Sequence, residues 1–295
     1  MIDSFDVIVI GGGPAGSSAA LILGRSRLKV LLIDKATPRN IRTHGIHGYL
    51  TRHAMSPIEF RRSAHKEILS VGVEIIYGEA SKVESKNAGF TVELCDGSRK
   101  LNALRIVVAT GLKDQMPDVE GMDSFYGTSV FHCPFCDGWE MRDKALGVYA
   151  KGGKGVAIAR GLLTWSADVR LFTDGVPLKK EDRMLVAEAE ILVHTEKIIR
   201  MTGRKGQLEN IELAGGEVIA RDAVFFDPQP CQQCSIPGDL GCTLTKSGAI
   251  RTDKRQRTEI PGLYVVGDAA ADPNMVAIAT ADGVKAALNI VQDLQ

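Results

Sequence analysis

The sequence has no long hydrophobic run. No stretch approaches 18 uninterrupted apolar residues, and the first apolar run, at residues 7–10, leads directly into glycines. A run that short is neither a signal peptide nor a membrane-spanning helix. We therefore expect a soluble, cytoplasmic protein that does not associate with a membrane.

An excess of charge of either sign is also absent. The 295 residues include 36 basic and 36 acidic side chains, so the formal net charge is zero. This balance does not favour a nucleic-acid-binding surface or a polybasic membrane-binding surface. Cysteine is sparse as well, because six residues in a chain of this length do not make the disulfide framework of a secreted protein.

A nucleotide-binding pattern is present at the amino terminus. The predicted strand at residues 5–10 runs into residues 11–16, which read GGGPAG and fit the pattern G-x-G-x-x-G. A helix is expected to begin at about Pro14. A second predicted strand, at residues 28–33, ends on Asp34, and 21 residues separate Gly13 from this acid. The spacing is close to that of a carboxylate that binds ribose.

The positions of this glycine loop have separable roles. Gly11 makes the tight turn, Gly13 lets the backbone approach a pyrophosphate, and Gly16 lets the helix pack closely on the strand. The start of the helix adds amide donors and a partial positive charge. Together with Asp34 as the ribose acceptor, these features predict a bound dinucleotide.

The same order of elements occurs twice along the chain. A strand, a glycine loop, a helix and a strand recur from about residue 145, and an antiparallel meander follows each unit. This repetition predicts an α/β protein with two Rossmann-like, three-layer ββα dinucleotide-binding domains, each with a small antiparallel meander. We interpret the last segment as completing the first domain. The predicted domains are residues 1–114 with 248–295, and residues 115–247.

Two Cys-x-x-Cys pairs are present. Cys133 and Cys136 can close and reopen a disulfide, and in a reducing compartment such a pair indicates redox or metal chemistry. The second pair, Cys231 and Cys234, lies near the predicted return to the first domain. With Cys242 it is interpreted either as hinge thiols without chemistry or as a metal or electron-relay site. The pairs lie too far apart for a compact zinc ribbon, so we expect no metal site.

Four motifs together resemble those of low-molecular-weight thioredoxin reductases. They are residues 11–16, residues 107–111 (VVATG), the Cys133/Cys136 pair and residues 262–268 (GLYVVGD), in the order and spacing of that family. The resemblance implies FAD in the first domain and a redox-active Cys133–Cys136 disulfide against the isoalloxazine ring. It further implies that Cys136 faces the flavin, that Cys133 attacks the substrate, and that Asp137 acts as acid and base. Members of this family are usually homodimers.

The resemblance also implies which residues contact FAD. Asp268 is expected to bond to the ribityl and phosphate part. The loop after Asp34 is expected to pass over the flavin, where His47 either contacts the ring or satisfies loop backbone. Residues 274–276 read Asn-Met-Val where the family usually has Arg-Gln-Ala. The remaining expected contacts are Pro14, Ala15, Lys35, Arg39, Asn40, Ala109, Thr110, Gly111, Gly267, Met275 and Val276.

The second glycine loop departs from the family. Ala150 stands where the family has a turn glycine, and the arginines that bind the NADPH 2′-phosphate are replaced. Each charge-assisted bond to phosphate contributes about 1.5–3 kcal/mol. Losing two therefore removes roughly 3–6 kcal/mol, or about two to four decades of affinity. Asp174 occupies the position at which an acidic residue binds a ribose without a 2′-phosphate. The second nucleotide site is therefore predicted to hold a second FAD or NADH, or to be empty. Its residues are Gly152, Gly153, Lys154, Gly155 and Asp174.

These features predict a flavoprotein disulfide oxidoreductase that exchanges electrons between FAD and the Cys133–Cys136 pair. The expected donor is something other than NADPH, such as ferredoxin or a second flavin. The alternatives are an oxygen-dependent dithiol oxidase acting on a small molecule, an NAD(P)H-dependent thioredoxin reductase and a non-enzymatic flavin redox sensor. The expected partner is a thioredoxin-like protein or a small-molecule dithiol or disulfide. The direction of electron flow stays open, because it depends on the partners' potentials.

Overall fold

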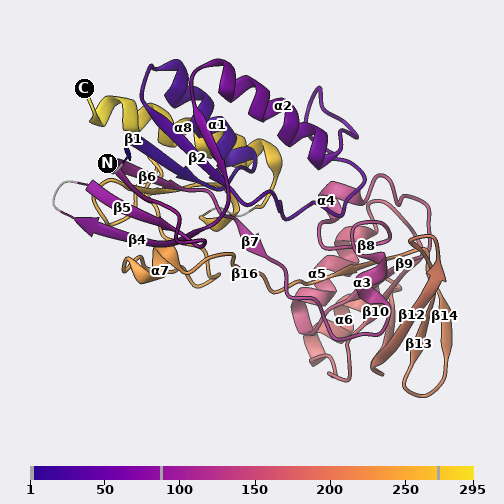
Figure 1. The fold of residues 1–295 in the computed structure, drawn as a ribbon. Helices are drawn as coiled ribbons and strands as arrows, with labels where there is room; N and C mark the ends of the chain where they lie inside the picture. The colour runs from indigo at the N-terminus through magenta and orange to yellow at the C-terminus, as the bar shows by residue number, and fades with distance from the viewer. Residues whose placement is uncertain (1–2, 87–88, 271–272) are drawn as a thin grey trace. The chain divides into compact units, whose positions relative to one another are not determined.

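The computed structural model describes residues 3–86, 89–270 and 273–295. The chain forms two compact units, each with its own parallel sheet (Figure 1). Unit 1 comprises Met1–Ile41, Pro57–Lys113 and Pro230–Gln295, and unit 2 comprises Arg42–Ser56 and Asp114–Gln229. None of the helices that the structure describes combines the length and apolar character needed to span a bilayer.

Unit 1 is built on a seven-stranded sheet with the order β3-β2-β1-β6-β5-β4, and β17 also pairs with β6. The strands β1, β2, β3, β6 and β17 are parallel, whereas β4 and β5 run antiparallel and form the predicted meander. The strands are β1 (Asp3–Ile10), β2 (Val30–Asp34), β3 (Glu74–Tyr77), β4 (Ala80–Lys86), β5 (Gly89–Leu94), β6 (Lys100–Val108) and β17 (Leu263–Val265).

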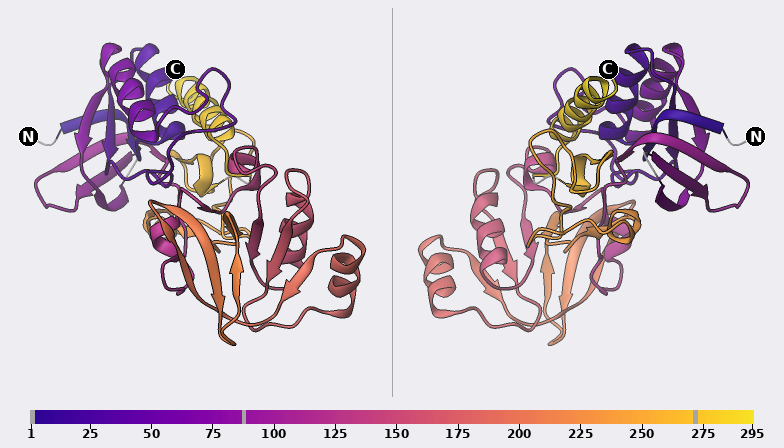
Figure 2. Two further views of the ribbon diagram at one scale, coloured as in Figure 1. Left: turned by 90° about the vertical axis from the view of Figure 1, so that its right-hand side faces the viewer. Right: turned by 90° about the vertical axis from the view of Figure 1, so that its left-hand side faces the viewer.

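Two long helices of unit 1 pack against each other on one face of the sheet, although they come from opposite ends of the chain. Figures 1 and 2 show the carboxy-terminal helix α8 beside α1. Helix α1 begins at Pro14, which has its fixed φ at a position where its missing N–H costs nothing. The helices are α1 (Pro14–Arg25), α2 (Pro57–Ser70), the short α7 (Ile236–Asp239) and α8 (Val276–Asp293), with a 3₁₀ turn η1 (Gly267–Ala269).

The central strand β1 is buried on both faces. Val7 and Val9 pack in the cluster that α1 and α8 cover, and Ile8 and Ile10 pack in the cluster on the meander side. A strand covered on both sides is apolar throughout rather than alternating, as in parallel sheets. Helices, sheet and meander therefore form three layers, which confirms the predicted fold class.

Unit 2 repeats this arrangement with a five-stranded parallel sheet and a separate three-stranded antiparallel meander. The sheet has the order β11-β10-β9-β15-β8 and the meander has the order β12-β13-β14. The strands are β8 (Val130–Phe131), β9 (Leu146–Tyr149), β10 (Val169–Phe172), β11 (Leu192–His194), β12 (Ile198–Arg204), β13 (Gln207–Leu213), β14 (Val218–Ala220) and β15 (Ala223–Phe226). The helices are α3 (Met122–Phe125), α4 (Pro134–Asp137), α5 (Gly152–Leu162) and α6 (Lys180–Glu188).

The boundaries differ from those predicted at residues 114/115 and 247/248. The return to unit 1 occurs at Pro230, because β16 (Cys231–Gln232) pairs antiparallel with β7 (Leu112–Lys113) and Ile236 is buried in the core of unit 1. Residues 42–56 group with unit 2, where the Arg42 side chain pairs with Asp123. Sequence patterns missed both features, because a two-stranded pairing and a single core residue leave little periodicity to detect.

Candidate functional site

The first glycine loop has the backbone geometry that a dinucleotide requires. Gly11 has φ of 110°, and a Cβ there would lie 2.4 Å from the carbonyl oxygen of Ala109. A Cβ on Gly16 would lie 1.9 Å from the Gly11 carbonyl oxygen. At Gly13, by contrast, no described heavy atom lies within 4 Å of the Cβ position. The loop is therefore closed where the protein packs on itself and open over Gly13, which fits a pyrophosphate.

Asp34, the last residue of β2, is held as a carboxylate by neighbours on α2. Its Oδ1 accepts from the backbone N–H of Ala36 at 2.9 Å, and its Oδ2 accepts from Arg61 Nε and lies 3.2 Å from His65 Nε2. Burial raises the pKa of this carboxyl, but the hydrogen bonds from His65, Ala36 and Arg61 lower it to about 2. A carboxylate has about four acceptor positions, so these contacts leave acceptor capacity for a ribose hydroxyl.

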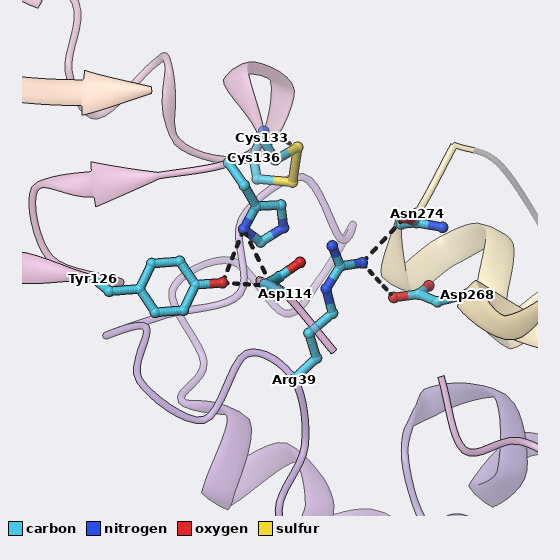
Figure 3. Close-up of a disulfide and its surroundings, with 8 residues drawn as sticks. Arg39, Asp114, Tyr126, Cys133, Cys136, Asp268 and Asn274 are labelled. Atoms are coloured by element: carbon cyan, nitrogen blue, oxygen red, sulfur yellow. Dashed lines mark hydrogen bonds and ion pairs between the residues drawn. A yellow bond between two sulfur atoms is a disulfide. The ribbon is translucent and has the colours of Figure 1, made fainter. Parts of the chain in front are cut away.

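Asp268 lies at the amino end of η1 beside the glycine loop. Its neighbour Gly267 has φ of 67°, and a Cβ there would lie 2.8 Å from Ala15 Cβ, so η1 and α1 pack closely. Arg39 Nη1 donates to Asp268 Oδ2 and to Asn274 Oδ1, both at 3.1 Å (Figure 3). These contacts gather residues from three distant parts of unit 1 at the glycine loop.

The end of β6 carries the predicted Thr110 and Gly111. Gly111 has φ of 70°, and its carbonyl oxygen accepts from the N–H of Gln233 at 3.2 Å. The Thr110 hydroxyl accepts from Cys234 Sγ at 3.3 Å. The strand that returns to unit 1 therefore fixes the VATG turn, and this role of Gln233 and Cys234 was not predicted.

The other predicted FAD residues of unit 1 lie around these groups. Lys35 forms a 2.8 Å ion pair with Glu79. Asn40 lies in the turn that follows Arg39, and Met275 is the N-cap of α8, with Val276 as its first residue. The amino end of this long helix adds backbone donors and a partial positive charge, which favour an anionic or electron-rich ligand.

The Cys133–Cys136 disulfide is closed, as the Cys-x-x-Cys spacing suggested (Figure 3). Cys133 is the N-cap of α4, and Pro134 begins the helix. Asp137 ends α4, where burial and then the nearby Glu140 carboxylate raise the pKa of its carboxyl to about 7. An acid with this pKa is about half protonated at neutral pH, which suits proton transfer to and from a thiol.

Polar and apolar groups that the sequence did not single out flank the disulfide. The Tyr126 hydroxyl donates to Asp114 Oδ2 at 2.6 Å and lies 3.2 Å from Nδ1 of His132, the residue before Cys133. Phe135 is 77% exposed within the Cys-x-x-Cys motif itself. Its ring packs edge-on against that of Trp165, with the ring centroids 5.7 Å apart.

The predicted His47 belongs to unit 2. Its Nδ1 lies 3.3 Å from Oε1 of Glu140, three residues after Asp137. The loop after Asp34 therefore packs next to the redox motif within the same unit. Glu140 was not among the predicted site residues, because nothing in its local sequence distinguishes it from an ordinary surface acid.

The second glycine loop is closed by ion pairs of its own residues. Lys151 Nζ lies 3.0 Å from Asp174 Oδ2, and Lys154 Nζ lies 2.6 Å from Asp227 Oδ1. A Cβ on Gly155 would lie 2.7 Å from the Ala150 carbonyl oxygen, so the helix–strand packing of a nucleotide fold is kept. The acid expected to bind a ribose is thus already paired with a lysine.

The glycine with positive φ occupies a different position in the second loop than in the first. In the first loop it is Gly11, whereas here Gly152 has φ of 59° and the aligned Ala150 is not among the described residues with positive φ. The substitution of alanine for the turn glycine is therefore accommodated by a different backbone path. Gly153 faces Asp182 Oδ1, which a Cβ would approach to 3.3 Å.

The three cysteines Cys231, Cys234 and Cys242 have different surroundings and do not form a common site. Cys231 is exposed with its Sγ 3.7 Å from the Lys113 carbonyl oxygen, whereas Cys234 contacts Thr110. Cys242 is buried, and burial raises the pKa of its thiol, which makes it unreactive. Among the described residues these cysteines form no metal-ligand cluster.

Comparisons with known proteins agree with this geometry. Residues 5–283 match the family model described as pyridine nucleotide-disulphide oxidoreductase. "Thioredoxin reductase sirT" of Leptosphaeria maculans is 28% identical, over 96% of this chain and 92% of that protein. The thioredoxin reductase of Mycoplasma genitalium is 23% identical, over 98% and 95% of the two chains.

Solved structures are similar over the whole chain. The crystal structure of HlmI superposes with a TM-score of 0.94 at 34% identity, covering 99% of this chain and 92% of that one. A putative thioredoxin reductase, TrxB, from Bacillus anthracis superposes with a TM-score of 0.93 at 31% identity, covering 98% of each chain.

Proposed function

We propose, from the premise that this chain belongs to the pyridine nucleotide-disulphide oxidoreductase family, that it is an FAD-dependent thiol–disulfide oxidoreductase of the thioredoxin-reductase type. The observation that carries the proposal is a closed Cys133–Cys136 disulfide directly followed by Asp137, whose carboxyl has its pKa raised to about 7. A reversible disulfide beside an acid of that strength supports two-electron, two-proton exchange at neutral pH.

FAD would lie in unit 1, with its pyrophosphate over Gly13 at the start of α1 and a ribose hydroxyl donating to Asp34. Bound there, it supplies a two-electron redox couple. Arg39 and Asp268 would face its ribityl and phosphate part, and the positive end of α8 lies beside them. The other residues of the proposed site are Gly11, Pro14, Ala15, Gly16, Lys35, Asn40, Ala109, Thr110, Gly111, Gly267, Met275 and Val276.

The protein's own groups handle the protons. Opening the Cys133–Cys136 bond consumes two electrons and two protons and leaves two thiols. Protonated Asp137 donates to one departing thiolate, and its carboxylate takes the proton back when the disulfide closes. The Asp137 carboxylate then takes the proton of the Cys133 thiol, and the resulting thiolate attacks a substrate disulfide, which forms a mixed disulfide and releases one substrate thiol. Cys136 attacks this mixed disulfide, which re-forms the Cys133–Cys136 bond and releases the second substrate thiol.

We propose that the electron donor is not NADPH. The support is the Lys151–Asp174 pair, in which a carboxylate stands where the family binds the 2′-phosphate. Since the arginines that bind the 2′-phosphate in the family are also replaced, this position offers NADPH no comparable phosphate contact, and we propose a ferredoxin or a second flavin as the donor.

Anaerobic mixing tests the donor. With micromolar NADPH we expect no rapid loss of flavin absorbance near 450 nm, although dithionite bleaches the same sample. Rapid bleaching by NADPH contradicts the donor proposal alone, because the disulfide chemistry does not depend on it. Extraction and counting of FAD then decides the second site, since two FAD per chain indicate a second flavin and one does not.

We further propose that the substrate is a thioredoxin-like protein or a small-molecule dithiol or disulfide, and that the protein acts as a homodimer. The exposed Phe135 beside the disulfide supports a docking contact. Cys136→Ser is expected to retain a mixed disulfide with the substrate that Cys133→Ser does not form, as mass spectrometry would detect. Light scattering measures the oligomeric state, and peroxide release with small dithiols would assign the oxidase direction.

A further inference from the structure

Three side chains with metal-binding groups meet in unit 2. His47, His53 and Glu140 each offer one ligand atom, and these atoms all lie within 4.8 Å of one another. The two histidines come from the loop at residues 42–56, and the glutamate comes from the turn after α4. The redox chemistry proposed above uses neither His53 nor the contact between the two histidines.

The backbone of the loop holds the two histidines together. The N–H of Ile46 donates to the Met55 carbonyl oxygen at 2.8 Å, and the N–H of Ala54 donates to the Ile46 carbonyl oxygen at 2.9 Å. The bridge pairs Ile46 with Met55, so the segments that carry His47 and His53 run side by side, and the ring centroids of the two histidines lie 5.1 Å apart. The loop therefore presents both imidazoles on one short hairpin.

The turn that carries His53 is strained. Thr51 and Ala54 have φ of 71° and 58°, a region that residues with a Cβ rarely adopt. The loop is also tightly closed, because a Cβ on Gly45 would lie 2.9 Å from Ala54 Cα. Non-glycine residues with such backbone angles persist where the surrounding structure over-determines them, and they concentrate at functional sites.

Two buried polar atoms of the cluster lack partners. Neither Nδ1 of His47 nor Oε2 of Glu140 has a hydrogen-bond partner among the described residues. Nδ1 lies 3.3 Å from Oε1 of the same glutamate, longer than the 2.7–2.9 Å of a charge-assisted hydrogen bond. Two ligands of a tetrahedral zinc ion, each about 2.0–2.1 Å from the metal, lie about 3.3 Å apart. The spacing is that of two neighbouring ligands of one ion.

We propose that His47, His53 and Glu140 bind a Zn²⁺ ion, with the fourth position open to solvent on the side of the exposed His53. Two imidazoles and a carboxylate are a zinc donor set, and imidazole selects transition metals over Mg²⁺ and Ca²⁺, which prefer oxygen. The ion would tie the loop at residues 42–56 to the turn that follows the redox helix α4. This site goes beyond the proposed function and does not depend on it.

Equilibrium dialysis of the oxidised protein against zinc sulfate, without reductant, tests the proposal. We expect one Zn²⁺ per chain and at least tenfold weaker binding in His53→Gln and in Glu140→Gln. His44→Gln is the matched control, because His44 is exposed in the same loop and lies outside the cluster. It should bind zinc as the wild type does. Thermal melting checks that each variant folds. If Glu140→Gln does not fold, the result for His53→Gln decides the test, because His53 is exposed and its replacement should not disturb the fold.

The redox cysteines need a separate control, because free thiolates bind zinc. The Cys133→Ser/Cys136→Ser variant should keep the single Zn²⁺. Amide hydrogen exchange at residues 46–55 should slow when zinc is added to the wild type and not when it is added to His53→Gln. The proposal is overturned if the wild type binds no zinc, if the double serine variant loses it, if His44→Gln weakens it as much as His53→Gln, or if magnesium chloride competes equally.

Discussion

At the scale of single residues, the surroundings of Asp34 and Asp137 drive the pKa values of two carboxyl groups apart. Burial raises the pKa in both cases. Asp34 then receives hydrogen bonds from His65, Ala36 and Arg61, which outweigh burial, whereas Asp137 gains only a further negative neighbour. One carboxyl is therefore a fixed anion suited to binding, and the other exchanges protons near neutral pH.

Asp137→Asn should separate activity from stability. The pKa of the Asp137 carboxyl is raised from 3.8 to about 7, so its ionisation costs more in the folded state than in the unfolded state. This cost lowers the free energy of unfolding progressively between pH 3.8 and pH 7 and reaches its full value above pH 7. Asparagine removes the penalty, so the free energy of unfolding at pH 8 should rise by up to about 4 kcal/mol, three units at 1.36 kcal/mol each. Disulfide turnover should fall by about 10²–10⁴ and lose its pH dependence near 7.

Stopped-flow rates and urea denaturation, both measured from pH 5 to pH 9, check this prediction. An Asp137→Asn protein that keeps the wild-type pH profile of turnover would show that another group carries the proton. Asp143→Asn, on an exposed acid shortly after the motif, is the control and should change neither quantity.

Arg61→Met should weaken the acid tolerance of unit 1. The pKa of Asp34 is lowered from 3.8 to about 2, so its stabilisation is present above pH 3.8 and is lost as the pH falls toward 2. The difference between 3.8 and about 2 corresponds to about 2.5 kcal/mol, which is the net effect of the three neighbouring donors against burial. Without Arg61, acid unfolding followed by circular dichroism should begin at a higher pH. Arg62→Met, which removes an exposed arginine next to it, should leave the transition unchanged.

At the scale of elements, the turn between β1 and α1 contains glycines that pack against the protein's own backbone and a glycine that faces open space. Gly16 packs against the Gly11 carbonyl oxygen, whereas Gly13 faces open space. The two positions look alike in the sequence motif, and only the surroundings of each Cβ position distinguish them.

Gly13→Ala and Gly16→Ala should therefore fail in different ways. A methyl at position 13 meets no described protein atom, so the apoprotein should unfold as the wild type does, while FAD binding weakens by at least tenfold. A methyl at position 16 would lie 1.9 Å from backbone and should destabilise the fold itself by about 2 kcal/mol or more. Thermal melting of apoprotein and FAD titration by fluorescence measure the two effects, and equal destabilisation by both variants would contradict this assignment.

The second loop shows how the same element changes when its ligand contacts change. Ala150 is tolerated because the positive φ is at Gly152, and Lys151 and Lys154 pair with acids of their own unit. The strand and helix still pack closely through Gly155. The element thus keeps its packing residues while its ligand-facing residues differ from those of the family.

At the scale of the whole molecule, the chain contributes residues 42–56 and 114–229 to unit 2 and returns to unit 1 for the last time at Pro230. The return is fixed by the β7–β16 pairing and by Ile236, which is 2% exposed in the core of unit 1. The two ends of the chain therefore belong to one unit, and the carboxy-terminal helix α8 completes the layer that α1 begins.

Ile236→Ala should destabilise unit 1 and not unit 2. Truncating a buried isoleucine costs about 2–5 kcal/mol, and this side chain packs only in a cluster of unit 1. Hydrogen exchange resolved by peptide should accelerate in β1 and β6 and stay unchanged in β9 and β15. Leu244→Ala, on a side chain that is 56% exposed in the same segment, is the control. Faster exchange in unit 2 would restore the predicted boundary at residue 247.

Features that depend on residues close together in the chain could be predicted from the sequence, whereas contacts between residues far apart in the chain could not. The glycine loop, the disulfide and the helix start at Pro14 depend on neighbours a few positions away. The donors that hold Asp34, by contrast, come from α2, and the carboxylate that helps raise the pKa of Asp137 shares a cluster with His47 from a separate loop. Their residue types are common on protein surfaces, so no spacing rule singles them out.

The sequence alone determined the three-layer α/β class, the dinucleotide-type glycine loop and the Cys-x-x-Cys pair, because each rests on local spacing and hydrophobic periodicity. The tertiary structure alone decided where the chain returns, which carboxyl stays charged, how Lys151 covers Asp174, and that two histidines and a glutamate meet. The physical reason is that burial and long-range pairing set charge states and ligand geometry, and neither is a property of a residue's neighbours in the chain.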